Sequence, residues 1–217
     1  MIAKLVVILS LLPVMGGSPI FASLILGFGS SVYAIDPATG NVSVYAPGIG
    51  SINGVIQGPP GLFYLTTGVN LYAINLVGTR VEVGEGVIGN DIASIPGAGF
   101  YAAYGSGIYS YFPGCLPTPC PNNGTLVATL PSTTSVIEAV GMDLFAVSTY
   151  GVHTVSLVNP LSGKVTTVGA ADGIPTFDSV ISLAYDPDTA SLIADVAIGA
   201  PSPVSYTHLT LPTNREV

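Results

Sequence analysis

Few side chains of this chain could carry out acid–base or nucleophilic chemistry. General acid–base catalysis most often uses histidine, because its pKa lies near the working pH. His153 stands at the start of a predicted strand, and His208 is the second of two histidines. We find neither a strained serine turn nor a glycine-rich phosphate loop between a strand and a helix. We therefore predict no catalytic residue, and a structural role for His153.

Carboxylates offer one candidate metal site. Asp186-Pro187-Asp188-Thr189 ends a predicted strand, and its side-chain oxygens are of the type that calcium prefers. The same residues also favour a turn in which the Asp side chain bonds to the backbone. We prefer the turn, because Gly-Pro and Pro-Gly turns occupy the equivalent places elsewhere. No cofactor is predicted, with calcium as the alternative.

Two cysteines and two glycosylation motifs lie in predicted loops or turns. Cys115 and Cys120 fall five residues apart in a proline-rich stretch. In an oxidising compartment they predict a local disulfide, with a reduced pair as the next alternative and a metal site as the last. Asn41-Val42-Ser43 and Asn123-Gly124-Thr125 are acceptor motifs for N-linked glycans, which makes Asn41 and Asn123 candidate glycosylation sites.

Most tyrosines lie on predicted strands, where an aromatic side chain usually packs against neighbouring strands. Tyr104 and Tyr150 fall instead at predicted hairpin tips. They are the candidate contacts for a partner, which we expect to be a protein or a glycan.

The composition excludes some partners. Only 7% of residues are charged, against about a quarter in an ordinary soluble domain. The net charge of −8 reflects a shortage of bases, since Arg80 and Lys164 are the only ones between the leader and the tail. Nucleic acids and anionic membranes are bound by clustered bases, so neither is expected as a partner.

The N-terminus has the features of an export signal. Lys4 supplies the charged start, residues 5–15 the apolar stretch, and Ile20-Phe21-Ala22 a small-residue end. The stretch is too short to span a bilayer, which takes about 20 residues. We predict that residues 1–22 are a cleaved signal peptide, with an uncleaved anchor as the alternative. The protein is then secreted or on the cell surface, with no membrane span after cleavage.

A pattern of four short β-prone runs recurs about every 40 residues. The strands that it predicts must position the candidate side chains named above. The pattern begins at Leu24, Leu62, Phe100, Leu144 and Leu192. Turn-forming Gly, Pro, Asn and Asp separate the runs, and no apolar run has a helical period. We predict an all-β protein, a β-propeller of four repeats of four antiparallel strands plus the start of a fifth. The predicted repeats are 24–61, 62–99, 100–143, 144–191 and a partial repeat 192–203, within a domain 23–203.

A family resemblance supports this architecture. The segments VYAIDPATGNV (32–42), LYAIN (71–75) and TVSLVNPLSGKV (154–165) resemble the hairpins of YVTN and NHL-like propeller repeats, which are common in secreted and surface-layer proteins. The resemblance implies a propeller and says little about function. Quinoprotein propellers are less similar, because their repeats carry a Trp and this chain has none.

The last fourteen residues do not resemble the rest. VSYTHLTLPT (204–213) is similar to one reading frame of a sequencing adapter. We predict that residues 204–217 are a non-native tail, that the natural chain is truncated near Pro203, and that the ring is incomplete.

The sequence supports three functions. The first is a secreted or cell-surface binding or structural module of unknown ligand. The second is an extracellular propeller enzyme, a lyase or hydrolase, whose site lies largely in missing repeats. The third is a surface-layer or adhesion subunit.

Overall fold

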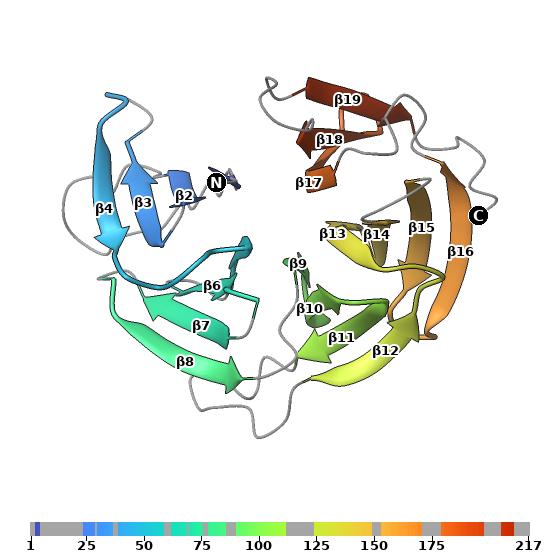
Figure 1. The fold of residues 1–217 in the computed structure, drawn as a ribbon, viewed down its shortest axis with the longest axis horizontal. Helices are drawn as coiled ribbons and strands as arrows, with labels where there is room; N and C mark the ends of the chain where they lie inside the picture. Colours follow the sequence, from blue (N-terminus) through green and yellow to red (C-terminus); the bar gives the residue numbers. More distant parts are fainter. Residues whose placement is uncertain are drawn as a thin grey trace. The chain divides into compact units, whose positions relative to one another are not determined.

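The computed structural model describes residues 3–4, 24–28, 30–36, 39–58, 62–68, 70–75, 78–85, 90–111, 124–148, 153–170, 179–197 and 205–210. Its described residues form antiparallel sheets, labelled in Figure 1. The chain divides into two units: Met1–Gly89 with Pro113–Asn123, and Asn90–Phe112 with Gly124–Val217. Within the described residues, no helix has the length and apolar character needed to cross a membrane.

The first unit contains two four-stranded sheets. One runs in the order β1 (Ala3–Lys4), β2 (Leu24–Phe28), β3 (Ser31–Ile35) and β4 (Val42–Ala46). The other contains β5 (Gly54–Gln57), β6 (Leu62–Thr66), β7 (Asn70–Asn75) and β8 (Arg80–Glu85). Strands that follow one another in each sheet are antiparallel neighbours, so each sheet is a simple up-and-down ribbon.

The second unit contains three sheets, drawn from green to red in Figure 1. The first consists of β9 (Asp91–Ile95), β10 (Gly99–Tyr104), β11 (Gly107–Tyr111) and β12 (Thr125–Thr129). The second consists of β13 (Thr134–Val140), β14 (Asp143–Ser148), β15 (Thr154–Asn159) and β16 (Lys164–Ala170). The third consists of β17 (Ser179–Asp186), β18 (Ser191–Ala197) and β19 (Ser205–Thr210). The predicted all-β class and the four-stranded antiparallel sheets are confirmed.

The sequence repeat and the sheet are offset by one strand. Strand β9 closes the predicted repeat 62–99, yet it pairs with β10, which opens the next repeat. Ser94 lies opposite Phe100 in this ladder. The same holds for β5, β13 and β17. Each closes one predicted repeat and pairs with the strand that opens the next, namely β6, β14 and β18. Each of these sheets is therefore built from two consecutive sequence repeats.

Strand β14 of the β13–β16 sheet is buried on both faces. Along β14, Leu144 and Ala146 belong to the core shared with the β9–β12 sheet. Phe145 and Val147 belong to the core shared with the β17–β19 sheet. Successive side chains of a strand point to opposite faces, so burial on both sides requires an unbroken apolar run. This explains why LFAV replaces the alternating pattern of a half-exposed strand.

The core of the first unit is formed by residues of the β1–β4 and β5–β8 sheets, and Tyr45 packs against it. Its ring meets Phe63 edge to face, with centroids 6.2 Å apart, and its hydroxyl donates to the carbonyl of Asn75. Gly78 has φ +78°, and a Cβ there would run into the Tyr45 carbonyl. Glycine is thus required at this turn by both conformation and close approach.

Asp36 opens the hairpin turn between β3 and β4. The hydroxyl of Thr39 donates to Asp36 Oδ2 at 2.7 Å, and the Gly40 N–H donates to the Asp36 carbonyl at 2.7 Å. Gly40 adopts φ +71°, the left-handed conformation that glycine takes at little cost. The Asp and Gly of the sequence motif therefore have the turn roles expected of them.

The turn after Asp186 is built in the same way. The Thr189 hydroxyl donates to Asp186 Oδ2 at 2.6 Å, and the Asp188 N–H donates to Asp186 Oδ1 at 3.0 Å. Ala190 takes the left-handed position with φ 50°, where the earlier turn has glycine. The carboxylate thus serves the turn, as the preferred interpretation of this motif requires. Among the described residues, no group of three or more metal-ligating side chains occurs.

Strands β1 and β19 fall within the two segments predicted to be removed or foreign. Ala3 and Lys4 pair with Gly27 and Phe28 of β2. Strand β19 runs antiparallel to β18 over its full length. Strand pairing uses backbone groups, which any chain without proline supplies. The pairing fits both a native and a foreign segment, so the signal peptide and the tail stay predictions.

Candidate functional site

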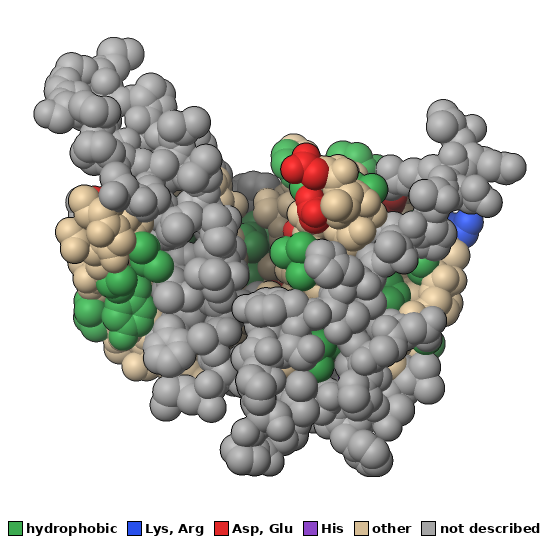
Figure 2. Space-filling view, turned by 90° about the horizontal axis from the view of Figure 1, so that it is seen from above, with side chains coloured by type: hydrophobic (Ala, Val, Ile, Leu, Met, Phe, Trp, Pro, Cys, Tyr) green, Lys and Arg blue, Asp and Glu red, His purple; other side chains and the backbone are tan. Residues whose placement is uncertain are grey.

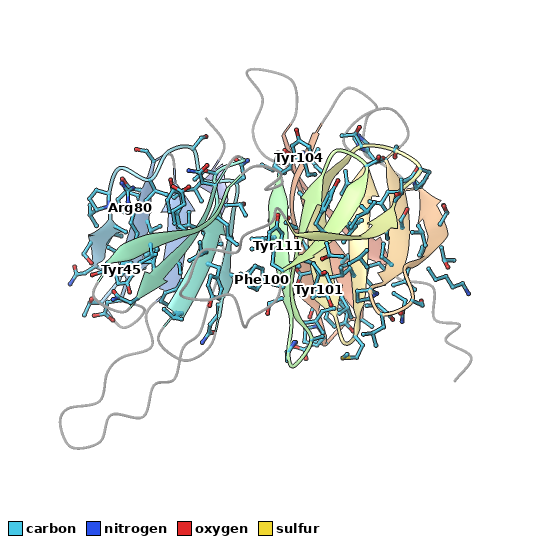
Figure 3. The ribbon with its side chains drawn as sticks, turned by 90° about the horizontal axis from the view of Figure 1, so that it is seen from below. Tyr45, Arg80, Phe100, Tyr101, Tyr104 and Tyr111 are labelled. Carbon is cyan, nitrogen blue, oxygen red and sulfur yellow. The ribbon has the colours of Figure 1, made fainter. Side chains whose placement is uncertain are left out.

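Of the predicted contact residues, the structure describes Tyr104. Its side chain is 46% exposed at the end of β10. Figure 3 labels this residue. Tyr150 lies outside the described residues, as do Cys115, Cys120 and Asn123. Asn41 is described and exposed.

Tyr104 stands on a firmly held turn. The Gly105 carbonyl accepts from the N–H of Thr134 at 2.8 Å, and the Ser106 carbonyl accepts from the N–H of Leu130 at 2.7 Å. Leu130 follows the last residue of β12, and Thr134 is the first residue of β13. Asn90 adds a third hydrogen bond, because its side chain donates to the Thr134 carbonyl at 3.2 Å. The exposed ring is therefore presented from a fixed base.

A polar cluster that the sequence did not reveal lies on β7 and β8. Asn70 and Tyr72 come from β7, Arg80 and Glu82 from β8, and we call these four residues the Tyr72 cluster. Tyr72 lies directly opposite Glu82 in the ladder. The Asn70 amide donates to the Tyr72 hydroxyl oxygen and to Glu82 Oε2, both at 3.0 Å. One amide thus fixes an aromatic ring and a carboxylate side by side.

Arg80 completes the Tyr72 cluster. Its guanidinium carbon lies 5.6 Å from the centroid of the Tyr72 ring, within the range of a cation–π contact. One of its N–H groups donates to the carbonyl of Gly48 at 2.6 Å. Arg80 and Glu82 are both exposed, whereas Asn70 and Tyr72 are half-buried. Figure 3 places Arg80 and Tyr45 in the same unit.

The Tyr72 cluster retains unused hydrogen-bonding capacity. A carboxylate has two acceptor oxygens, a guanidinium five donors, an amide one acceptor and two donors, and a phenol one donor. Of these, the hydrogen bonds among the described residues use one Glu82 oxygen, the Asn70 amide nitrogen and one Arg80 nitrogen. The Tyr72 proton, Asn70 Oδ1, Glu82 Oε1 and the other Arg80 donors can still bind an external polar ligand.

The spacing that builds the Tyr72 cluster is visible in the sequence. Asn70 and Tyr72 are two residues apart, as are Arg80 and Glu82, so each pair lies on one face of its strand. The two strands form one hairpin, which brings the pairs together. Searching for catalytic residue types alone passes over such a cluster, because its members become neighbours only when the two strands pair.

His153 lies immediately before β15 and is 2% exposed. Its Nδ1 is 3.0 Å from the Ser148 carbonyl oxygen, and the Ser148 hydroxyl accepts from the N–H of Thr154 at 2.8 Å. The ring thus joins the facing ends of β14 and β15. The Ser148 carbonyl oxygen thus lies beside the Nδ1 of this buried imidazole.

Charged groups are sparse on the described surface. Figure 2 shows one face of the molecule, where Asp and Glu atoms of the described residues gather in one place and Lys or Arg atoms appear at one edge. Arg80 is one of four basic residues in the whole chain. Its place in the Tyr72 cluster therefore makes this hairpin unusual in the protein.

Comparisons with known proteins define the fold. No family model matches the sequence, and no curated protein matches it. A crystal structure described as the extracellular domain of a hybrid two-component system from B. thetaiotaomicron is similar, with a TM-score of 0.55 and 13% identity. The match covers 88% of this chain and 26% of that one, so the chain spans about a quarter of its length. At this identity the likeness concerns the fold alone.

Two other structures match more loosely. The extracellular domain of a one-component system from the same organism gives a TM-score of 0.48 at 13% identity, covering 85% of this chain and 31% of that one. The computationally designed Ika4 protein gives 0.47 at 9% identity, covering 73% and 91%.

Proposed function

We propose that the chain is a secreted or cell-surface β-propeller repeat protein that acts as a binding module. Support for the propeller comes from the succession of up-and-down sheets and from the fold likeness at a TM-score of 0.55. Support for the location comes from the leader, from the low charge, and from the neighbour described as an extracellular domain.

The Tyr72 cluster is the observation that carries the binding role. Sugars present hydroxyl groups around an apolar ring face, and proteins bind them with carboxylates, amides, guanidinium groups and aromatic rings. The cluster provides one of each, held by Asn70 and by the contact between Arg80 and the Gly48 carbonyl. The ligand we propose is therefore a glycan.

The test is a glycan array followed by titration calorimetry with the full chain. A hit should lose at least tenfold in affinity in Glu82→Gln, which alters the carboxylate at similar size. Tyr72→Phe should weaken binding less, because the ring is kept. Gln57→Ala, an exposed change on β5 of the same unit, is the matched control.

The same samples separate the rival functions. Binding that survives Glu82→Gln and Tyr72→Phe would remove the Tyr72 cluster from the proposal. No glycan hit, together with turnover of a polysaccharide, would instead support the extracellular enzyme. Retention on isolated cell envelopes with no soluble ligand would support the surface-layer or adhesion subunit.

Two further proposals concern the segments outside the repeats. We expect the mature protein to begin near residue 23, and N-terminal sequencing of secreted protein checks this. We expect residues 204–217 to be absent from the natural protein. The gene read from an independent assembly decides the second point, because a native tail would appear there unchanged.

A further inference from the structure

Strand β4 exposes two large apolar side chains. Val42 is 60% exposed and Val44 is 59% exposed, and both lie on the last strand of the β1–β4 sheet. The outer backbone edge of β4 is not paired within that sheet. Exposed β-branched residues on an unpaired edge favour pairing with another chain. Natural proteins commonly protect such an edge.

Asn41 lies immediately before this strand. Its backbone is anchored, since its N–H donates to Thr39 Oγ1 at 3.3 Å and its carbonyl accepts from the Asp36 N–H at 2.9 Å. Its side chain is exposed and makes no hydrogen bond among the described residues. Ser43, the third residue of the acceptor motif, is exposed as well. The motif is thus extended, anchored and accessible.

Two other hairpin turns begin with an asparagine whose side chain is engaged in the turn. Asn75 Oδ1 accepts from the N–H of Thr79 at 2.9 Å. Asn159 Oδ1 accepts from Ser162, and its amide donates to Asp143. In the β3–β4 hairpin Asp36 performs this turn role, so the turn does not need the amide of Asn41.

We propose that Asn41 carries an N-linked glycan, which covers the exposed edge of β4. The inference rests on the export in the proposed function. The donor is a glycan linked to a polyprenyl diphosphate. The Asn41 amide nitrogen attacks C1 of the first sugar, the N–C bond forms, and the C1–oxygen bond breaks. The lipid diphosphate leaves with the electron pair, and the amide loses one proton.

Secretion from yeast tests the modification. The chain is exported once with its own leader and once with a yeast leader. Glycopeptide mapping after enzymatic deglycosylation in heavy-oxygen water should show a labelled Asp at position 41. Asn41→Gln and Ser43→Ala should abolish this label, whereas Ser43→Thr should keep it. Asn123→Gln, which removes the other motif, is the control and should also keep it.

The two leaders separate the possible failures. Export with the yeast leader and an unmodified Asn41 would overturn the glycan proposal. If the chain is exported with the yeast leader but not with its own leader, the prediction of a signal peptide is overturned. The modification of Asn41 is then measured on the exported sample.

Self-association of the protein tests whether the glycan covers the edge of β4. Removing the glycan enzymatically should shift the protein from monomer to larger species in size-exclusion chromatography. The variant with Val42→Thr and Val44→Thr should remain monomeric with or without the glycan. An unchanged elution profile of the deglycosylated wild-type protein would contradict a covering role.

Discussion

The carboxylate of Asp91 accepts a hydrogen bond from the backbone N–H of Ile137 at 3.1 Å. Asp91 lies on β9 and Ile137 on β13, so one side chain joins the first strands of two successive sheets. The second carboxylate oxygen accepts from the Ile92 N–H at 2.7 Å. Asp91 is fully buried, and backbone N–H groups satisfy both of its side-chain oxygens.

Asp91→Ala should destabilise the second unit by about 3 kcal/mol, because it leaves buried N–H groups without an acceptor. Asp91→Asn should cost less, since one acceptor oxygen remains. Urea unfolding followed by circular dichroism measures both. Asp188→Asn, at an exposed carboxylate of the same unit, should change the midpoint little. Equal midpoints for Asp91→Ala and wild type would show that the buried carboxylate does not hold the sheets together.

Two glycines of the first unit allow two costs of adding a side chain to be distinguished: the cost of a positive φ and the cost of a steric clash with a neighbour. Gly40→Ala should cost about 1 kcal/mol, because it places a side chain at positive φ with nothing within 4 Å. Gly78→Ala should cost at least about twice as much, since its Cβ also meets the Tyr45 backbone. The comparison is made by thermal unfolding of the two variants. Similar losses would argue against close packing of the β7–β8 turn on β4.

Ala190→Gly should stabilise the second unit. Ala190 holds φ 50°, a conformation that costs a residue with a Cβ about 1 kcal/mol. Glycine relieves this strain but loses more entropy on folding, so the expected gain is about 0.5 kcal/mol. Ala170→Gly, at an exposed position in β16, should instead destabilise. A fall in melting temperature for Ala190→Gly would contradict the strained turn.

Stability should fall in alkaline solution. Burial raises the pKa of Tyr101 above its usual value of 10.0. Burial also raises the pKa of Tyr45, although a backbone hydrogen bond with Gly78 acts in the opposite direction. A raised folded-state pKa means that the folded protein keeps a proton that the unfolded chain loses. The stabilisation is therefore complete below about pH 10 and declines as the pH rises through the folded-state pKa.

Tyr101→Phe should make the alkaline decline shallower, because phenylalanine has no proton to lose. The measurement is the urea midpoint as a function of pH. Thr129→Ala, an exposed change on β12, should follow the wild-type profile. If the urea midpoint of Tyr101→Phe falls with pH as steeply as that of the wild type, groups other than Tyr101 cause the loss of stability.

The sequence predicts the period and the strands well, because turn residues and apolar runs are local signals. It does not predict where one sheet ends and the next begins, since a period has no natural starting point. Only the pairing of β9 with β10 across a short turn reveals the offset. Likewise, Asp91 was one unremarkable carboxylate among several, and its role depends on Ile137, which is 46 residues away.

The sequence placed Tyr104 at a hairpin tip, and its side chain is exposed there. Its contact with a partner stays a prediction. The Tyr72 cluster was missed because its chemistry arises from the alignment of two strands, which composition and motif spacing do not specify. Pairing Tyr72 with Glu82 requires the register of the β7–β8 ladder.

The offset between repeat and sheet has a consequence for proteolysis. A cut at Ala98, in the turn between β9 and β10, separates two sequence repeats but divides one sheet, because it cuts the edge strand β9 from β10, β11 and β12. The N-terminal fragment keeps β9, which remains hydrogen-bonded to β10 of the C-terminal fragment. A nicked protein should therefore stay associated in native buffer and separate only in denaturant, so that damage to one turn does not release a repeat.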